Sequence, residues 1–133
     1  MAVIGKIISG GQTGADRGAL EAALKAGFAY GGLVPKGRLA EDGCVPAKFT
    51  AMEEADMEDY RFRTRWNAEH SDATLILAFS DQLAVFKWIA KVSKKIGGSP
   101  LVLNVAGPRE SKEPGLEAAV ESYVARLISE EVE

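Results

Sequence analysis

The residues with the clearest chemical potential form a glycine-rich stretch near the start of the chain. Residues 9–17 read SGGQTGADR and stand between an apolar run at 3–8 and an alanine-rich run at 15–26. This order predicts a strand, a tight turn and the start of a helix. The first N–H groups of a helix lack partners within it, and glycine lets another group approach the backbone closely. The stretch is therefore a candidate site for a phosphate or another oxyanion.

The order of glycines in this stretch is also compatible with an alternative, a turn that has a purely structural role. It matches neither G-x-G-x-x-G, typical of dinucleotide sites, nor G-x-x-x-x-G-K-[ST], typical of P-loops. Short connections from strand to helix also use glycine for close packing alone. Gln12 and Thr13 favour a ligand, because their polar ends could add donors to those of the backbone.

Positively charged side chains follow two other segments that are predicted as strands. Lys36 and Arg38 come after the apolar segment 28–34, and Arg109 comes after the segment 100–105. A guanidinium can bind two oxygens of one oxyanion, whereas a lysine adds a mobile point charge. These three side chains could neutralise one bound anion. Alternatively, they could simply be exposed charges that keep their loops in contact with water.

Predicted strands and helices alternate along the chain. Strands are expected at 3–8, 28–34, 73–79 and 100–105, and helices at 15–26, 61–70, 81–95 and 115–130. The alternation predicts an α/β fold, a three-layer Rossmann-like sandwich with a mostly parallel sheet of about four to five strands. Loops at the carboxyl ends of such strands share one edge, where ligands bind. The glycine-rich turn and the loops that carry the cations should meet there.

Composition narrows the class of protein. The chain has 133 residues, a formal net charge of −3, one cysteine and one histidine. We expect one domain over residues 1–133, without the roughly 20 apolar residues of a membrane span or a secretory signal, and hence a cytoplasmic protein. The net charge argues against nucleic acid as a partner. Cys44 and His70 are too few for a cysteine or histidine metal cage, so no direct cation site is expected.

Five motifs, in this order, resemble those of one known family. They are ISGGQTGADR at 8–17, PKGR with AEDG at 35–43, RT with WN at 63–67, SDATLIL at 71–77 and LNVAGPRES at 103–111. With them, nearly the whole chain resembles the putative molybdenum carrier family, a circularly permuted branch of the SLOG Rossmannoid superfamily. One departure stands out. Members of that family follow the third strand with a Gly-Gly-Thr turn, a helix and a further strand, a unit that is missing after residue 79 here. The loss weakens the case for nucleotide binding and could expose a sheet edge that a second subunit covers.

The resemblance implies a binding protein rather than an enzyme, with molybdate or a similar small oxyanion as its ligand and a homo-oligomer as its assembly. Backbone N–H groups of residues 10–14 would hold the anion, and the three cations would neutralise it. The predicted ligand-binding residues are Ser9, Gly10, Gly11, Gln12, Thr13, Gly14, Asp16, Lys36, Gly37, Arg38, Asp42 and Arg109. Two alternatives stay open. One is a SLOG-type enzyme that binds a nucleotide phosphate, with Glu41, Asp42 or Glu110 as its acid–base group. The other is an oligomerising member of the family without a ligand.

Overall fold

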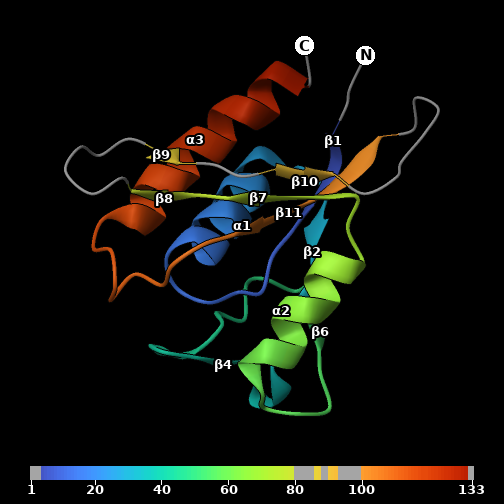
Figure 1. The fold of residues 1–133 in the computed structure, drawn as a ribbon, viewed down its shortest axis with the longest axis vertical. Coiled ribbons are helices and arrows are strands. Elements are labelled where there is room, and N and C mark those ends of the chain that lie inside the picture. Colours follow the sequence, from blue (N-terminus) through green and yellow to red (C-terminus); the bar gives the residue numbers. More distant parts are fainter. Residues whose placement is uncertain (1–3, 80–85, 88–89, 93–99, 132–133) are drawn as a thin grey trace.

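The fold is built around a five-stranded sheet, seen in the computed structural model, which describes residues 4–79, 86–87, 90–92 and 100–131. The strand order is β10-β7-β11-β1-β2, and all neighbouring strands are parallel except β10, which runs antiparallel to β7 (Figure 1). The strands are β1 (Ile4–Ile8), β2 (Tyr30–Gly31), β7 (Ala73–Ile76), β10 (Ala90–Val92) and β11 (Leu101–Ala106). The predicted α/β class with a mostly parallel sheet is thus confirmed.

Three of the four predicted helices are confirmed almost to the residue. They are α1 (Ala15–Ala26), α2 (Tyr60–Glu69) and α3 (Leu116–Glu131). Helix α1 ends at Gly27, whose left-handed backbone (φ 66°, ψ 25°) is the expected C-cap. Helix α2 begins after Asp59, whose carboxylate accepts the Arg61 N–H. None of the described helices is long and apolar enough to cross a membrane.

Helices α1 and α3 pack against each other and supply the main core together with one face of the sheet. Their close approach depends on Gly18, where a Cβ would lie 2.4 Å from the Glu117 carbonyl oxygen. Alternation along β11 sends Leu103 and Val105 into this core, while the Asn104 amide donates to the Thr74 hydroxyl of the neighbouring strand. The sheet and these two helices thereby fix the start of α1, where the glycine-rich turn lies.

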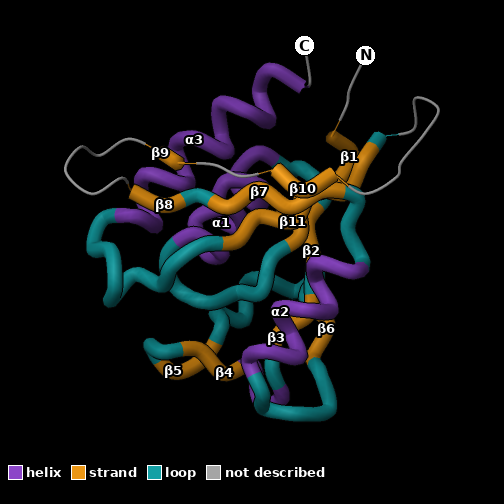
Figure 2. The backbone as a smooth tube through the Cα atoms, in the orientation of Figure 1, coloured by secondary structure: helices purple, strands orange, loops and turns teal. Residues whose placement is uncertain are grey.

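The predicted strand 28–34 is broken into two short strands rather than continuous. Its second half pairs outside the main sheet. Gly32 has φ 125°, and a Cβ there would lie 2.1 Å from the Ser9 carbonyl oxygen. The chain therefore leaves the main sheet after β2. Figure 2 shows the resulting short elements: β3 (Leu33–Val34) pairs with β6 (Glu53–Glu54), and β4 (Leu39–Ala40) forms a hairpin with β5 (Gly43–Cys44) after the 3-10 turn Lys36–Arg38.

The predicted helix at 81–95 is wrong wherever the structure describes that segment. Strand β9 (Phe86–Lys87) pairs antiparallel with β8 (Ala78–Phe79), and β10 pairs antiparallel with β7. A helix would leave the outer backbone groups of β7 without partners, whereas a strand satisfies them. The rest of the prediction, at 80–85, 88–89 and 93–95, lies outside the described residues. So does most of the segment after residue 79, where we expected a helix–strand unit to be missing.

Candidate functional site

Three segments meet at the carboxyl edge of the sheet. They are the glycine loop (residues 9–14) after β1, the tip of the β4–β5 hairpin, and the loop 107–115 after β11. The Ala15 N–H donates to the Pro108 carbonyl (3.2 Å), and the Glu110 N–H donates to the Thr13 hydroxyl (3.1 Å). The N–H of Glu41 at the hairpin tip donates to Gln12 Oε1 (2.8 Å). The three loops thus lie together as the strand order predicts.

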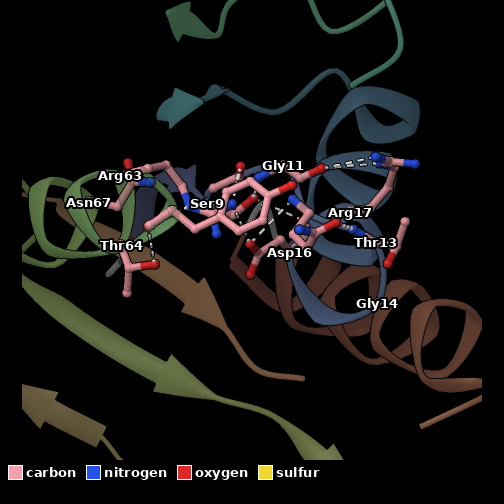
Figure 3. A network of polar contacts seen from close by, with 12 residues as sticks. Ser9, Gly11, Thr13, Gly14, Asp16, Arg17, Arg63, Thr64 and Asn67 are labelled. Carbon is pink, nitrogen blue, oxygen red and sulfur yellow. Dashed lines mark hydrogen bonds and ion pairs between the residues drawn. The ribbon is translucent and has the colours of Figure 1, made fainter. Parts of the chain in front are cut away.

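The glycine loop is buried, and its backbone donors bind acceptors of the chain itself. Gly10 and Gln12 donate to the Asp16 carboxylate, Gly11 to the Ser9 hydroxyl (3.4 Å), Thr13 to Gln12 Oε1 (3.1 Å), and Gly14 to the Glu117 carboxylate (3.1 Å). Figure 3 shows the part of this network that surrounds Asp16. Two of these acceptors are carboxylates, so anionic groups of the protein already interact with the positive end of α1.

Two of the glycines are needed because other parts of the chain come very close. A Cβ at Gly10 would lie 2.3 Å from the side chain of Arg63. A Cβ at Gly14 would lie 2.3 Å from the Pro108 carbonyl oxygen, and its φ of 83° also disfavours other residues. The sequence left open whether these glycines serve the packing of the turn or the binding of a ligand. Gly10 and Gly14 have at least the first of these roles.

Asp16 and Arg63 form a buried ion pair beside the glycine loop. Arg63 reaches from α2 and donates from Nη1 to the Gly10 carbonyl oxygen (2.7 Å), with Nη1 3.6 Å from Asp16 Oδ2 (Figure 3). Burial raises the pKa of Asp16 to about 6, against the opposing effects of the Arg63 charge and of the hydrogen bond from Gln12. A cavity of about 20 Å³ lies next to this pair, with Asn104 on its wall. Its size suits one water molecule.

Of the three predicted cations, Arg109 alone lies at the junction of the loops. Its guanidinium lies 5.9 Å from the centre of the Tyr60 ring, and its charge helps to lower the pKa of Glu41. Arg38 donates instead to carbonyl oxygens of its own loop, those of Val45 (3.3 Å), Pro46 (2.9 Å) and Phe49 (3.1 Å). Lys36 is exposed and forms no ion pair with any residue that the structure describes. The expected convergence of all three cations on the glycine loop is therefore not observed.

Two of the three proposed acid–base groups are engaged in structural contacts. Arg17 binds Asp42 through two hydrogen bonds (2.5 and 3.1 Å), which anchors the hairpin tip to α1 and lowers the pKa of the Asp42 carboxyl. Glu110 accepts the N–H groups of Gly115 (2.7 Å) and Glu117 (2.8 Å), at the start of α3. Gly37, also predicted at the site, donates its N–H to Glu54 (2.8 Å). These contacts give each residue a role in holding a loop.

Glu41 is the residue through which all three loops make contact. Its carboxylate accepts hydrogen bonds from the Thr13 hydroxyl, the Ser111 hydroxyl (2.6 Å) and the Ser111 N–H (3.1 Å). Hydrogen bonds from Ser111 and then Thr13 hold the pKa of Glu41 below its ordinary value. Ser111 is a site residue that the predicted set omitted, and Arg63 is another. The motifs at 63–67 and 103–111 contain both, and these motifs were the only signal.

Gln12 has a buried donor for which the described residues supply no acceptor. Its Oε1 accepts the N–H groups of Thr13 and Glu41, which fixes the orientation of the side-chain amide because both neighbours are donors. The Nε2 group then has no hydrogen-bond partner among the described residues. Gln12 is only 5% exposed, so solvent does not supply the acceptor freely. The described residues thus leave one side-chain donor of the glycine loop without an acceptor.

Residues 7–97 match the model of the circularly permutated YpsA SLOG family. The chain belongs to this family. A crystal structure of a protein from Syntrophus aciditrophicus SB, described as a putative molybdenum carrier protein, is similar to the chain, with 34% identity and a TM-score of 0.73. The match covers 93% of this chain and 96% of that one. None of the curated proteins matches the chain.

The match agrees with the resemblance read from the five motifs and with the Rossmann-like fold. It says nothing of which residues bind a ligand. Within the part of the chain that the structure describes, no group of three histidine, cysteine or acidic residues is placed to hold a metal ion. The groups that this part of the site offers to a ligand are hydrogen-bond donors and the Arg109 guanidinium.

Proposed function

We propose that the protein binds a small tetrahedral oxyanion where the glycine loop, the hairpin tip and the loop 107–115 meet, and that molybdate is the first ligand to test. The description of the related protein from Syntrophus aciditrophicus supports molybdate as the candidate. The observation that carries the proposal is the Nε2 donor of Gln12, for which no described residue is an acceptor. In this proposal molybdenum is bound as an oxyanion, so the site needs donors and positive charge rather than metal ligands.

The missing acceptor favours an anion oxygen. A buried donor without a partner costs about 1–3 kcal/mol, which a bound oxygen would recover. The Thr13 hydroxyl lies at the next residue, and Arg109 supplies positive charge at the same junction. A ligand with several oxygens and negative charge meets both requirements, whereas a neutral ligand gains nothing from the Arg109 charge.

The donors around Glu41 support the same kind of ligand. Two hydroxyls and one backbone N–H, from Thr13 and Ser111, already bind a carboxylate there. Hydroxyls, backbone N–H groups and arginine are the donors that proteins use for phosphate and similar oxyanions. The site therefore binds an anion in its present state, and that anion is a side chain of the protein.

Isothermal titration calorimetry with Gln12→Glu tests the proposal. The titrants are molybdate, tungstate, sulfate, phosphate and AMP. The substitution retains Oε1 as the acceptor for two N–H groups and replaces the Nε2 donor with a charged oxygen. We expect the wild type to bind molybdate or tungstate and Gln12→Glu to bind at least ten-fold more weakly, because a donor becomes a repelling charge.

A matched control separates the loss of the donor from the general effect of added charge. Ala68 is exposed near the end of α2, so Ala68→Glu adds one negative charge outside the junction of the loops. This variant should bind like the wild type. The proposal is wrong if no oxyanion binds at millimolar concentration, or if Gln12→Glu and Ala68→Glu bind equally well. Binding of AMP without binding of any free oxyanion would instead favour the nucleotide alternative.

A further inference from the structure

We infer that Glu41 determines the specificity of this site: its carboxylate is an internal ligand that an external anion must displace, so tetrahedral dianions bind and monoanions do not. The inference rests on the proposed oxyanion site. It assigns a role to a residue that the predicted ligand-binding set did not include. Three features of the described residues carry it, namely the donors around Glu41, the unfilled donor of Gln12 and the charge of Arg109.

The first feature is the number of donors around an exposed side chain. Glu41 is exposed at the hairpin tip, where water could solvate its carboxylate fully. It nevertheless accepts three hydrogen bonds, from donors on two loops that are 98 residues apart, Thr13 and Ser111. Exposed carboxylates gain little from single surface contacts. Convergent donors of this kind define an anion site, and Glu41 is its occupant.

The second feature is the difference between a carboxylate and a tetrahedral anion. The two oxygens of Glu41 bind the Thr13 and Ser111 donors but leave Gln12 Nε2 unpaired. An anion with four oxygens has acceptors for these donors and for the Gln12 amide as well. A planar monoanion such as acetate or nitrate offers little that Glu41 does not already provide. The tetrahedral ligand therefore gains a hydrogen bond when it replaces the side chain.

The third feature is the distribution of charge. Asp42, next to Glu41, is already bound by Arg17, and Asp16 is paired with Arg63. Arg109 acts on Glu41 itself and becomes available to the ligand when Glu41 leaves. A dianion interacts with this guanidinium more strongly than the single charge that it replaces, whereas a monoanion gains nothing by the exchange. Charge and hydrogen bonding thus select the same class of ligand.

The fold allows this exchange without unfolding the hairpin. Glu41 covers both residues of the proposed site, because its N–H binds the Gln12 amide oxygen and its carboxylate binds the Thr13 hydroxyl. The Glu41 side chain can rotate into solvent, since it is exposed at the tip. The pair between Arg17 and Asp42 meanwhile holds the next residue of the hairpin on α1. We therefore expect a local movement at the tip when the ligand binds.

The test compares Glu41→Gln with the wild type for two classes of titrant, the dianions molybdate, tungstate and sulfate and the monoanions nitrate and acetate. The substitution removes the charge of the competing group with little change in its size. We expect Glu41→Gln to bind molybdate or tungstate at least ten-fold more tightly and to bind monoanions that the wild type excludes. Glu53→Gln is the matched control, because it removes the same charge from an exposed residue on β6. It should change neither affinity.

A second readout follows the hairpin directly. Cys44 is the only cysteine of the chain and is exposed on β5, so a fluorophore can be attached there alone. Molybdate should change its emission in the wild type and much less in Glu41→Gln, where the carboxylate contacts are already weakened. Glu41→Ala serves as a second variant with the same expected direction.

The possible outcomes separate this inference from the proposed function. Binding of molybdate by the wild type with equal or weaker binding by Glu41→Gln, and exclusion of monoanions by both, would overturn the inference and leave the oxyanion site in place. Binding by Glu41→Gln but not by the wild type would support competition by the Glu41 carboxylate and would overturn the proposed function, because the unsubstituted protein then holds no oxyanion. If neither protein binds any oxyanion, the proposed function and the inference fail together.

Discussion

The buried carboxyl of Asp16 should make the stability of the protein depend on pH in an unusual direction. Most described carboxyls with a shifted pKa, such as that of Asp42, have it lowered, so they stabilise the fold above their pKa. Asp16 has its pKa raised to about 6 from 3.8, mainly because burial disfavours its charge. The native state therefore holds a proton on Asp16 at pH values where the unfolded chain has lost it. The Asp16 contribution to the free energy of unfolding must fall as pH rises from about 4 to about 6.

The magnitude follows from the two pKa values. A difference of about two units corresponds to roughly 3 kcal/mol in total, and about 2 kcal/mol of this should be lost between pH 4.5 and pH 7. Asp16→Asn removes the titration but keeps a side chain of the same size. Its amide still offers one oxygen to the N–H groups that the carboxylate binds, those of Gly10 and Gln12.

Urea unfolding of the wild type and Asp16→Asn at pH 4.5, 5.5 and 7 measures this effect. The absolute stability of each protein includes every other titrating group, but these contributions cancel in the difference between the two proteins. We expect the variant to gain about 2 kcal/mol relative to the wild type between pH 4.5 and pH 7. A difference that stays constant, or that changes in the opposite direction, would show that Arg63 and the N–H donors outweigh burial.

Three further substitutions test individual contacts. Gly14→Ala should cost about 3 kcal/mol or more in urea unfolding, because its φ is 83° and its Cβ would lie 2.3 Å from a carbonyl oxygen; a cost below 1 kcal/mol would contradict the close packing of loop 107–115. Arg38→Ala should cost about 1–2 kcal/mol and leave oxyanion affinity in calorimetry unchanged, because its guanidinium binds backbone carbonyls; a large loss of affinity would return Arg38 to the site. Leu116→Ala should lower the free energy of unfolding by about 2–5 kcal/mol in the same assay, since the Leu116 side chain of α3 is fully buried in the core. A near-neutral effect would argue against this packing.

Local patterns predicted the parts of the fold that local physics decides. The spacing of Ala15, Ala19, Ala22 and Ala23 predicts α1, and Gly27 predicts its end, because helix periodicity and capping depend on neighbours in the chain. The order of strands and helices also predicted that the glycine loop and the loop after β11 lie together. These predictions did not depend on which side chains contact each other in the folded protein.

The rest depends on long-range contacts that spacing does not encode. The segment 81–95 has apolar residues at helical intervals, yet its described parts pair with β7 and β8, whose edges need partners. Arg38 stands after a strand, as a ligand-binding cation would, but its guanidinium turns to nearby carbonyl oxygens. Arg63 reaches the glycine loop from a separate helix, and no local pattern predicts that approach.

A crystal soaked in molybdate or tungstate would show where the anion binds. Anomalous scattering from the heavy atom locates it without assumptions about the ligand. We expect a single strong peak, with the oxyanion oxygens within hydrogen-bond distance of Gln12 Nε2 and the Thr13 hydroxyl and with the Glu41 side chain turned away from Ser111. A peak at a different place, or no peak at millimolar concentration with Glu41 still bound to Thr13 and Ser111, would rule out the proposed site.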